Sequence, residues 1–135
     1  MINPRPLLVD STLLLAYERD LTRRAQAFVV GAITDGRIVA VPALSLTLAA
    51  AELAGQNREL NWLVEDPEGP LHILPLSMNA LDVGTLAAQT GPLDAPHLEL
   101  AHMVHEARDI HAVVVTYEPK LYHGQTLDVI DMRPR

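Results

Sequence analysis

Short apolar runs alternate along the chain with longer segments in which apolar residues recur every three or four positions. A short apolar run between polar or turn-forming residues is typical of a buried strand, and the longer repeat is typical of a helix that packs on one face. The pattern predicts strands over residues 6–10, 37–42, 71–76, 111–116 and 127–131. It predicts helices directly after residue 10 and over 21–36, 43–55, 57–64, 78–91 and 95–109.

Strands that alternate with helices in this way indicate a mostly parallel sheet with helices on both faces. We therefore expect an α/β fold of three layers, with about four to five strands in its central sheet. The chain has 135 residues, the usual size of one domain, and we take 1–135 as a single domain. Ligands of such sheets bind beyond the carboxyl ends of the strands, so the residues that follow each strand are the candidates for a site.

Asp10 follows the first predicted strand directly, in the stretch LLVDSTLLL. An ionised carboxylate that is buried without a partner costs several kcal/mol, so its place between two apolar segments needs a reason. Ser11 or Thr12 is expected to cap the helix that follows. We interpret Asp10 as a carboxylate that a buried strand delivers to the edge of the sheet, where water or a metal ion can meet it.

Three further acids occupy comparable places. Asp94 immediately precedes the helix 95–109, Glu118 follows the fourth predicted strand, and Glu52 lies in an alanine-rich helix. Taken singly, Asp94 is explained as a helix cap, and the two glutamates as solvated surface acids. Three or four carboxylates that converge on one edge are, however, the ligand set that Mg²⁺ or Mn²⁺ prefers.

The composition narrows the class of protein. The formal net charge of −7 argues against tight, non-specific binding of nucleic acid, because such binding needs clustered Lys and Arg side chains against the phosphates. A metal ion held by carboxylates could still bind a phosphate group. The absence of cysteine excludes a disulfide framework and a thiolate site. No apolar stretch approaches the roughly 18 residues of a membrane span, and the first residues lack a signal-peptide pattern, so we expect a soluble cytoplasmic protein.

Six histidines raise the alternative of a zinc site. His102 and His105 lie three apart, with His97 earlier on the same predicted helix, but HMVHE is not the HExxH arrangement that gives zinc two ligands and a base. A polar helix flank explains these residues better. The chain also lacks a Gly-rich phosphate loop and the GxSxG motif of a serine hydrolase.

Four segments resemble, in the right order, the motifs of the PIN-domain family, which includes the ribonuclease toxins of the VapC type. LLVDSTLLLAY resembles the opening strand with its metal-binding aspartate, and VPALSLTLAAAEL resembles the segment with a helix-borne glutamate. LDAPHLELAH resembles the helix led by an aspartate, and AVVVTYEPKLY resembles the late strand. Each motif is short, and their order and spacing over nearly the whole chain carry the resemblance to a PIN-like fold.

The resemblance implies a metal-dependent endoribonuclease that hydrolyses RNA phosphodiesters. In such an enzyme a bound Mg²⁺ or Mn²⁺ ion lowers the pKa of a water molecule and offsets charge on the attacked phosphate. The resemblance also implies RNA as substrate, an antitoxin protein as partner and a homodimer. The residues that it assigns are Asp10, Glu52, Asp94 and Glu118 as metal ligands and catalytic groups, with Ser11 and Thr116 as supporting hydrogen-bond donors.

Two positions depart from the family pattern. The last acid is Glu118, where the family usually has aspartate, and the extra methylene moves its carboxylate outward. The helix-borne glutamate usually comes sooner, near Leu48 or Ala49 of this chain, so Glu52 would have to substitute from the next turn. The alternative hypothesis is therefore an incomplete site, in a catalytically weak or inactive PIN-like protein that acts as a binding or regulatory module.

Overall fold

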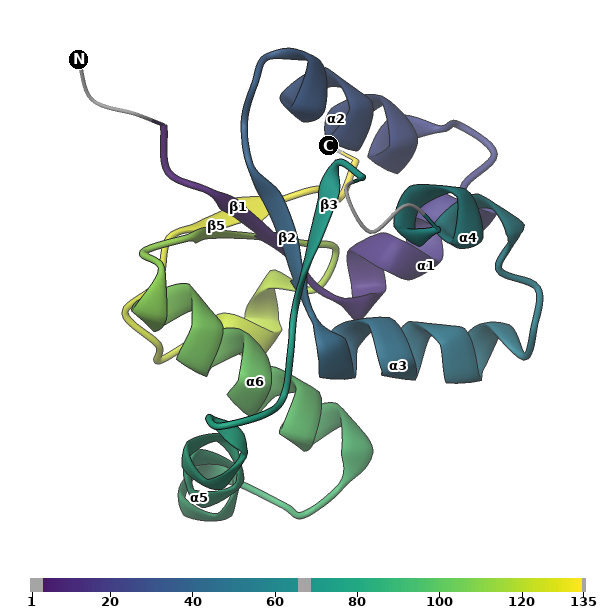
Figure 1. The fold of residues 1–135 in the computed structure, drawn as a ribbon. Coiled ribbons are helices and arrows are strands. Elements are labelled where there is room, and N and C mark those ends of the chain that lie inside the picture. Colours follow the sequence, from purple (N-terminus) through teal and green to yellow (C-terminus); the bar gives the residue numbers. More distant parts are fainter. Residues whose placement is uncertain (1–3, 66–68, 135) are drawn as a thin grey trace.

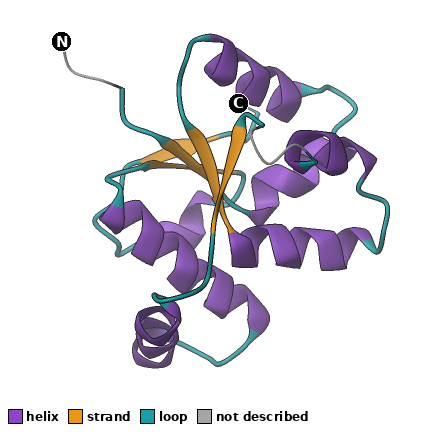
Figure 2. Ribbon diagram, viewed as in Figure 1, coloured by secondary structure: helices purple, strands orange, loops and turns teal. Residues whose placement is uncertain are grey.

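The structure, a computed structural model, describes residues 4–65 and 69–134. Five parallel strands form a sheet in the order β3-β2-β1-β4-β5, and helices lie on both of its faces (Figures 1 and 2). The predicted three-layer α/β fold is confirmed. The strands are β1 (Leu7–Val9), β2 (Val39–Pro42), β3 (Leu71–Leu74), β4 (Val113–Thr116) and β5 (Val129–Asp131). The helices are α1 (Ser11–Arg19), α2 (Arg24–Thr34), α3 (Ala43–Leu53), α4 (Arg58–Val64), α5 (Ala80–Thr90) and α6 (Ala95–Asp109), with a 3-10 turn η1 (Pro119–Tyr122).

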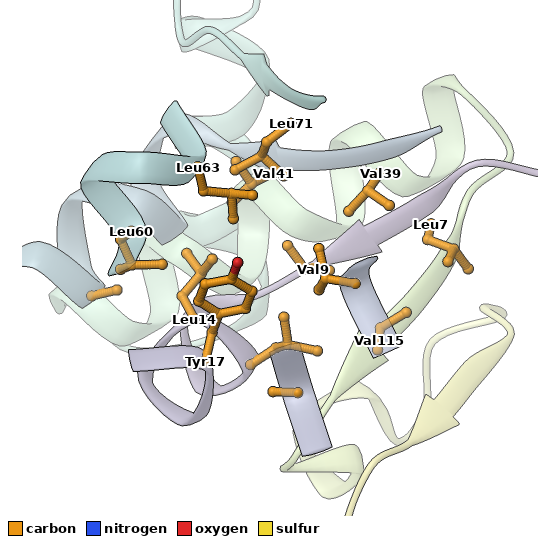
Figure 3. Packing of buried hydrophobic residues seen from close by; sticks show 14 of the residues in the cluster. Leu7, Val9, Leu14, Tyr17, Val39, Val41, Leu60, Leu63, Leu71 and Val115 are labelled. Atoms are coloured by element: carbon orange, nitrogen blue, oxygen red, sulfur yellow. The ribbon is translucent and has the colours of Figure 1, made fainter. Parts of the chain in front are cut away.

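The central strand β1 is buried on both faces. Successive side chains of a strand point to opposite sides of a sheet. Leu7 and Val9 therefore join the cluster that also holds Leu14 of α1 (Figure 3), whereas Leu8 packs with Met103 of α6 on the other face. All three β1 side chains are at most 1% exposed, so the residue that follows them leaves the sheet from inside the core.

The helix predicted over 21–36 begins later, at Arg24. The N–H and hydroxyl of Thr22 donate to Oδ1 of Asp20 at 2.9 and 2.7 Å, which closes a tight turn. Arg23 then takes a left-handed backbone conformation (φ 58°). This side-chain turn competes with the helix and delays its start by three residues.

The carboxyl edge of the sheet is where the chain enters several helices. β1 leads into α1 at once, β2 continues directly into α3, and β4 is followed by η1. α3 packs against both α1 and α6, so these helices and η1 surround the ends of the central strands. α5 lies against α6 on the side away from the sheet (Figure 1). None of the helices within residues 4–65 and 69–134 has the length and apolar composition that crossing a bilayer requires.

Candidate functional site

Asp10 is the residue that joins β1 to α1, and it is only 1% exposed. It occupies the N-cap position of α1, and its carboxylate accepts a hydrogen bond from the backbone N–H of Leu13. The prediction that Ser11 or Thr12 caps this helix is wrong, because the aspartate itself supplies the capping oxygen. A buried strand does deliver Asp10 to the carboxyl edge of the sheet, but the expectation that water meets its carboxylate there is wrong, because Asp10 is buried and bonded to protein donors.

The carboxylate of Asp10 accepts four hydrogen bonds. Its Oδ1 accepts from the Thr12 hydroxyl at 2.6 Å and from the Leu13 N–H at 3.2 Å. Its Oδ2 accepts from the Thr116 hydroxyl at 2.6 Å and from the Tyr122 hydroxyl at 2.7 Å. A carboxylate has about four lone-pair positions, so in this arrangement all of them are used by protein donors.

The two threonine hydroxyls are themselves oriented by the backbone. The N–H of Tyr117 donates to Oγ1 of Thr12, and the N–H of Glu118 donates to Oγ1 of Thr116, both at 2.9 Å. The two hydroxyl oxygens also lie 3.0 Å from each other, but each lies closer, at 2.6 Å, to an Asp10 oxygen, and a bond to an ionised carboxylate is the stronger one. Thr116, predicted as a supporting hydrogen-bond donor, donates here to Asp10 within the protein, and its role toward a ligand stays a prediction.

Tyr122 is the long-range member of this network. Burial raises the pKa of its hydroxyl well above the ordinary value, and the negative charge of Asp10 raises it further. The hydroxyl therefore keeps its proton and remains a donor to the carboxylate. Sequence reasoning did not single out Tyr122, because a residue in a short 3-10 turn has no periodic pattern to mark its buried side.

Glu99 of α6 is a second buried carboxylate at this edge, and sequence reasoning did not single it out. It is 6% exposed and accepts hydrogen bonds from the backbone N–H (2.8 Å) and hydroxyl (2.7 Å) of Ser11. Burial raises the pKa of Glu99, the Ser11 hydrogen bonds lower it, and the charge of Asp10 raises it. One signal was present: Glu99, Met103 and Glu106 share the spacing of the buried stripe of the helix.

A cavity of about 260 Å³ opens next to these carboxylates. Its polar lining includes Ser11, Thr12, Tyr122 and the two glutamates Glu52 and Glu99. Glu52 lies on α3 as predicted and is exposed, so α3 brings it to the same cavity as the partners of Asp10. The apolar lining comes from Leu15, Leu48, Pro96, Leu100 and Leu121.

The other two predicted acids lie outside this cavity lining. Asp94 is the N-cap of α6, as predicted, and its carboxylate accepts from the N–H of His97 at 2.9 Å. Glu118 follows β4 and is exposed, and only its backbone N–H takes part in the network, through Thr116. Neither side chain hydrogen-bonds to Asp10 or Glu99.

The described residues do not fit the divalent cation that the fold family implies. No group of three or more His, Asp or Glu side chains among them is arranged to hold a metal ion. The lone pairs of Asp10 are used by three hydroxyls and an amide, and both oxygens of Glu99 are bound to Ser11. The assignment of Asp10, Glu52, Asp94 and Glu118 as metal ligands stays a prediction.

A further polar cluster lies between α6 and the start of α3. His102 is fully buried, so the prediction that it lies on a polar helix flank is wrong. Its Nε2 lies 3.3 Å from Oε1 of Glu106, an ion-pair distance without hydrogen-bond geometry, and Asn79 donates to the same oxygen at 2.6 Å. The N–H of Leu44 points at Nδ1 of the ring at 3.5 Å. Burial lowers the pKa of His102, although the charge of Glu106 raises it.

Comparison with known proteins gives similarity in structure only. The sequence matches no protein-family model and no curated protein. The structure is similar to a chain of VapBC2 from Rickettsia felis bound to a DNA fragment from their promoter, with a TM-score of 0.68 and 12% identity over 93% of this chain and 97% of that chain. It is also similar to a chain of DNA-bound VapBC from Salmonella typhimurium, with a TM-score of 0.65 and 15% identity over 96% and 100% of the two chains.

At these identities the similarity establishes the fold and not the chemistry. It extends over nearly the whole described chain, as the order of the four sequence motifs predicts. The chain therefore adopts a PIN-like fold, which it shares with chains of VapBC toxin–antitoxin complexes.

Proposed function

We propose that this chain is a PIN-like binding module of the VapBC type that does not cleave RNA with a metal ion. The observation that supports this proposal is the saturated carboxylate of Asp10, whose four acceptor positions are used by Thr12, Leu13, Thr116 and Tyr122. A cation could bind there only after hydrogen bonds to a buried charge had been broken, and such bonds contribute about 1.5–3 kcal/mol each.

The partners that we propose follow from the fold. The similar chains come from complexes described as VapBC bound to DNA. We propose an antitoxin protein of the VapB type as the partner of this chain, and RNA as a ligand that is bound without hydrolysis. We further propose that residues 1–135 form one domain and that the protein is cytoplasmic. The homodimer stays a prediction, since the structure describes one chain.

The second candidate is the metal-dependent endoribonuclease, with Asp10, Glu52, Asp94 and Glu118 as its Mg²⁺ or Mn²⁺ ligands. One observation favours it: Glu52 and Glu99 line the same cavity at the carboxyl edge of the sheet. This function requires another arrangement, in which the Tyr122 hydroxyl has left Asp10. The two candidates therefore differ in whether the network around Asp10 is permanent.

An RNA cleavage assay distinguishes the two candidates. Wild type, Asp10→Asn and Asp94→Asn are incubated with a mixed-sequence single-stranded RNA in Mg²⁺, Mn²⁺ or EDTA, after circular dichroism has shown that each variant is folded. We expect the same residual cleavage in all samples. Cleavage by wild type that needs the metal and is lost in both folded variants would establish the ribonuclease and refute the binding module.

A further inference from the structure

Trp62, the one tryptophan of the chain, lies on α4 and is 73% exposed. A tryptophan side chain carries a large apolar area with one polar group, and tryptophan is enriched at binding interfaces. Trp62 lines an open cavity of about 310 Å³. The lining includes the side-chain amides of Asn57 and Asn61, the guanidinium of Arg58 and the carboxylates of Glu18 and Glu65.

Two asparagines in this cavity offer an unused donor and an unused acceptor. Nδ2 of Asn57 donates to Oδ1 of Asn61 at 3.1 Å, one helical turn away. No other side-chain hydrogen bond of these two residues occurs within the described part of the chain. The Nδ2 group of Asn61 and the Oδ1 atom of Asn57 are therefore available to a ligand. If both amide groups are turned so that O and N change places, one donor group and one acceptor atom are still available.

Hydrogen bonds from the first turn of α4 to α1 join two segments that line the cavity. Both carboxylate oxygens of Glu18 accept hydrogen bonds from backbone N–H groups of α4, one from Glu59 at 3.2 Å and one from Leu60 at 2.9 Å. Arg58 precedes Trp62 by one helical turn, and its guanidinium forms no ion pair within residues 4–65 and 69–134. A ring ligand on Trp62 would thus meet two side-chain amides and the positive charge of Arg58, with the carboxylates of Glu18 and Glu65 at other points of the lining.

The Trp62 cavity and the cavity beside Asp10 are lined by neighbouring turns of the same two segments. α1 contributes Leu15 to the Asp10 side and Glu18, one turn later, to the Trp62 side. At the end of α3, Glu52 lines the first cavity and Gly55 the second. α1 and the C-terminal end of α3 with the turn after it therefore contribute to both cavities.

From this arrangement we infer that the Trp62 cavity binds an unpaired nucleobase of a single-stranded nucleic acid. The base stacks on the indole, its edge pairs with the donor and acceptor of Asn57 and Asn61, and Arg58 contacts a neighbouring phosphate. Single strands are commonly recognised by this combination of aromatic stacking and edge hydrogen bonds. The inference rests on the proposed binding function, for which it names the ligand.

The single tryptophan makes the test direct, because fluorescence excited selectively from tryptophan, and not from the three tyrosines, comes from the cavity itself. The full chain is titrated in EDTA with single-stranded RNA, single-stranded DNA, duplex RNA and a neutral oligosaccharide. We expect saturable quenching by the single strands, and Asn61→Ala should weaken the apparent affinity by roughly 5- to 100-fold. Gln89→Ala, which removes an exposed amide on α5, is the matched control and should change nothing.

A second measurement tests the contribution of the Trp62 ring. Binding of a fluorescently labelled single-stranded RNA, followed by anisotropy, should be weakened about 5- to 100-fold by Trp62→Ala. Quenching by the oligosaccharide or the duplex alone would overturn the inference, as would no quenching or equal affinity in Asn61→Ala. Because these titrations contain no metal, a negative result leaves the proposal about Asp10 to its own test.

Discussion

The hydroxyl of Tyr122 donates a hydrogen bond to Oδ2 of Asp10 at 2.7 Å, although the two residues lie 112 positions apart in the sequence. This bond ties η1, near the end of the chain, to the junction between β1 and α1. Both side chains are buried, Asp10 at 1% and Tyr122 at 4% exposure. The contact therefore contributes to the fold and, in the same arrangement, uses an acceptor position that a metal ligand would need.

Tyr122→Phe keeps the ring and removes only the donor. Since hydrogen bonds to charged groups contribute about 1.5–3 kcal/mol, we expect the free energy of unfolding to fall by roughly that amount. Urea denaturation followed by circular dichroism measures it. Tyr117→Phe is the control, because the Tyr117 hydroxyl is buried and has no hydrogen-bond partner among the described residues, so its removal should leave stability unchanged or slightly higher. Equal effects of the two substitutions would contradict the role of Tyr122.

Asp10→Asn tests the whole network. An amide group in place of a carboxylate oxygen faces hydroxyl donors with a donor, and we expect a loss of roughly 2–4 kcal/mol in the free energy of unfolding. In a cluster of acids built to hold a metal, the same change relieves repulsion between like charges and raises stability in the absence of metal. The sign of the change, measured by urea denaturation in EDTA, thus separates the two kinds of site.

The fold could be predicted from the sequence because each strand is a short apolar run and each helix carries a one-sided apolar repeat. The late start of α2 could not be predicted, because it depends on the turn that Asp20 and Thr22 form through their side chains. Local chemistry of this kind does not alter the apolar repeat, so the pattern predicts the helix and misplaces its first residues.

The candidate site could be predicted only in part. Asp10 was found because it follows a buried strand, and Thr116 because it ends another. Glu99 and Tyr122 could not be predicted in the same way. Glu99 meets Ser11, and Tyr122 meets Asp10, only when α6 and η1 pack against the edge of the sheet. The sequence suggested acids as the partners of Asp10, and the structure places hydroxyls there.

The buried His102 predicts how the free energy of unfolding depends on pH. Its pKa in the folded protein lies below the ordinary 6.5, so folding favours the neutral ring, and protonation would place a hydrogen on Nδ1 against the N–H of Leu44. The stabilising contribution is complete above pH 6.5 and is lost as the pH falls below it, by at most about 1.4 kcal/mol per pH unit. The raised pKa of Glu99 acts in the opposite direction, so variants must be compared at each pH.

The comparison uses His102→Gln and, as control, His72→Gln, which replaces an exposed histidine on β3. Unfolding free energies at several values between pH 7.5 and 5, about the range in which histidine titrates, give the slope for each protein. We expect a flatter fall toward low pH in His102→Gln than in wild type, and a wild-type slope in His72→Gln. A wild-type slope in His102→Gln would assign the acid sensitivity to other groups.

Calorimetric titration with Mn²⁺ of the wild-type protein and of Asp10→Asn tests most directly whether protein hydrogen bonds keep the Asp10 carboxylate from binding a metal ion. If the four hydrogen bonds to Asp10 persist in solution, wild type and variant give the same heats of dilution and no saturable binding at millimolar Mn²⁺. Saturable binding to wild type that disappears in Asp10→Asn would show that the hydroxyl network opens and would contradict the non-catalytic account.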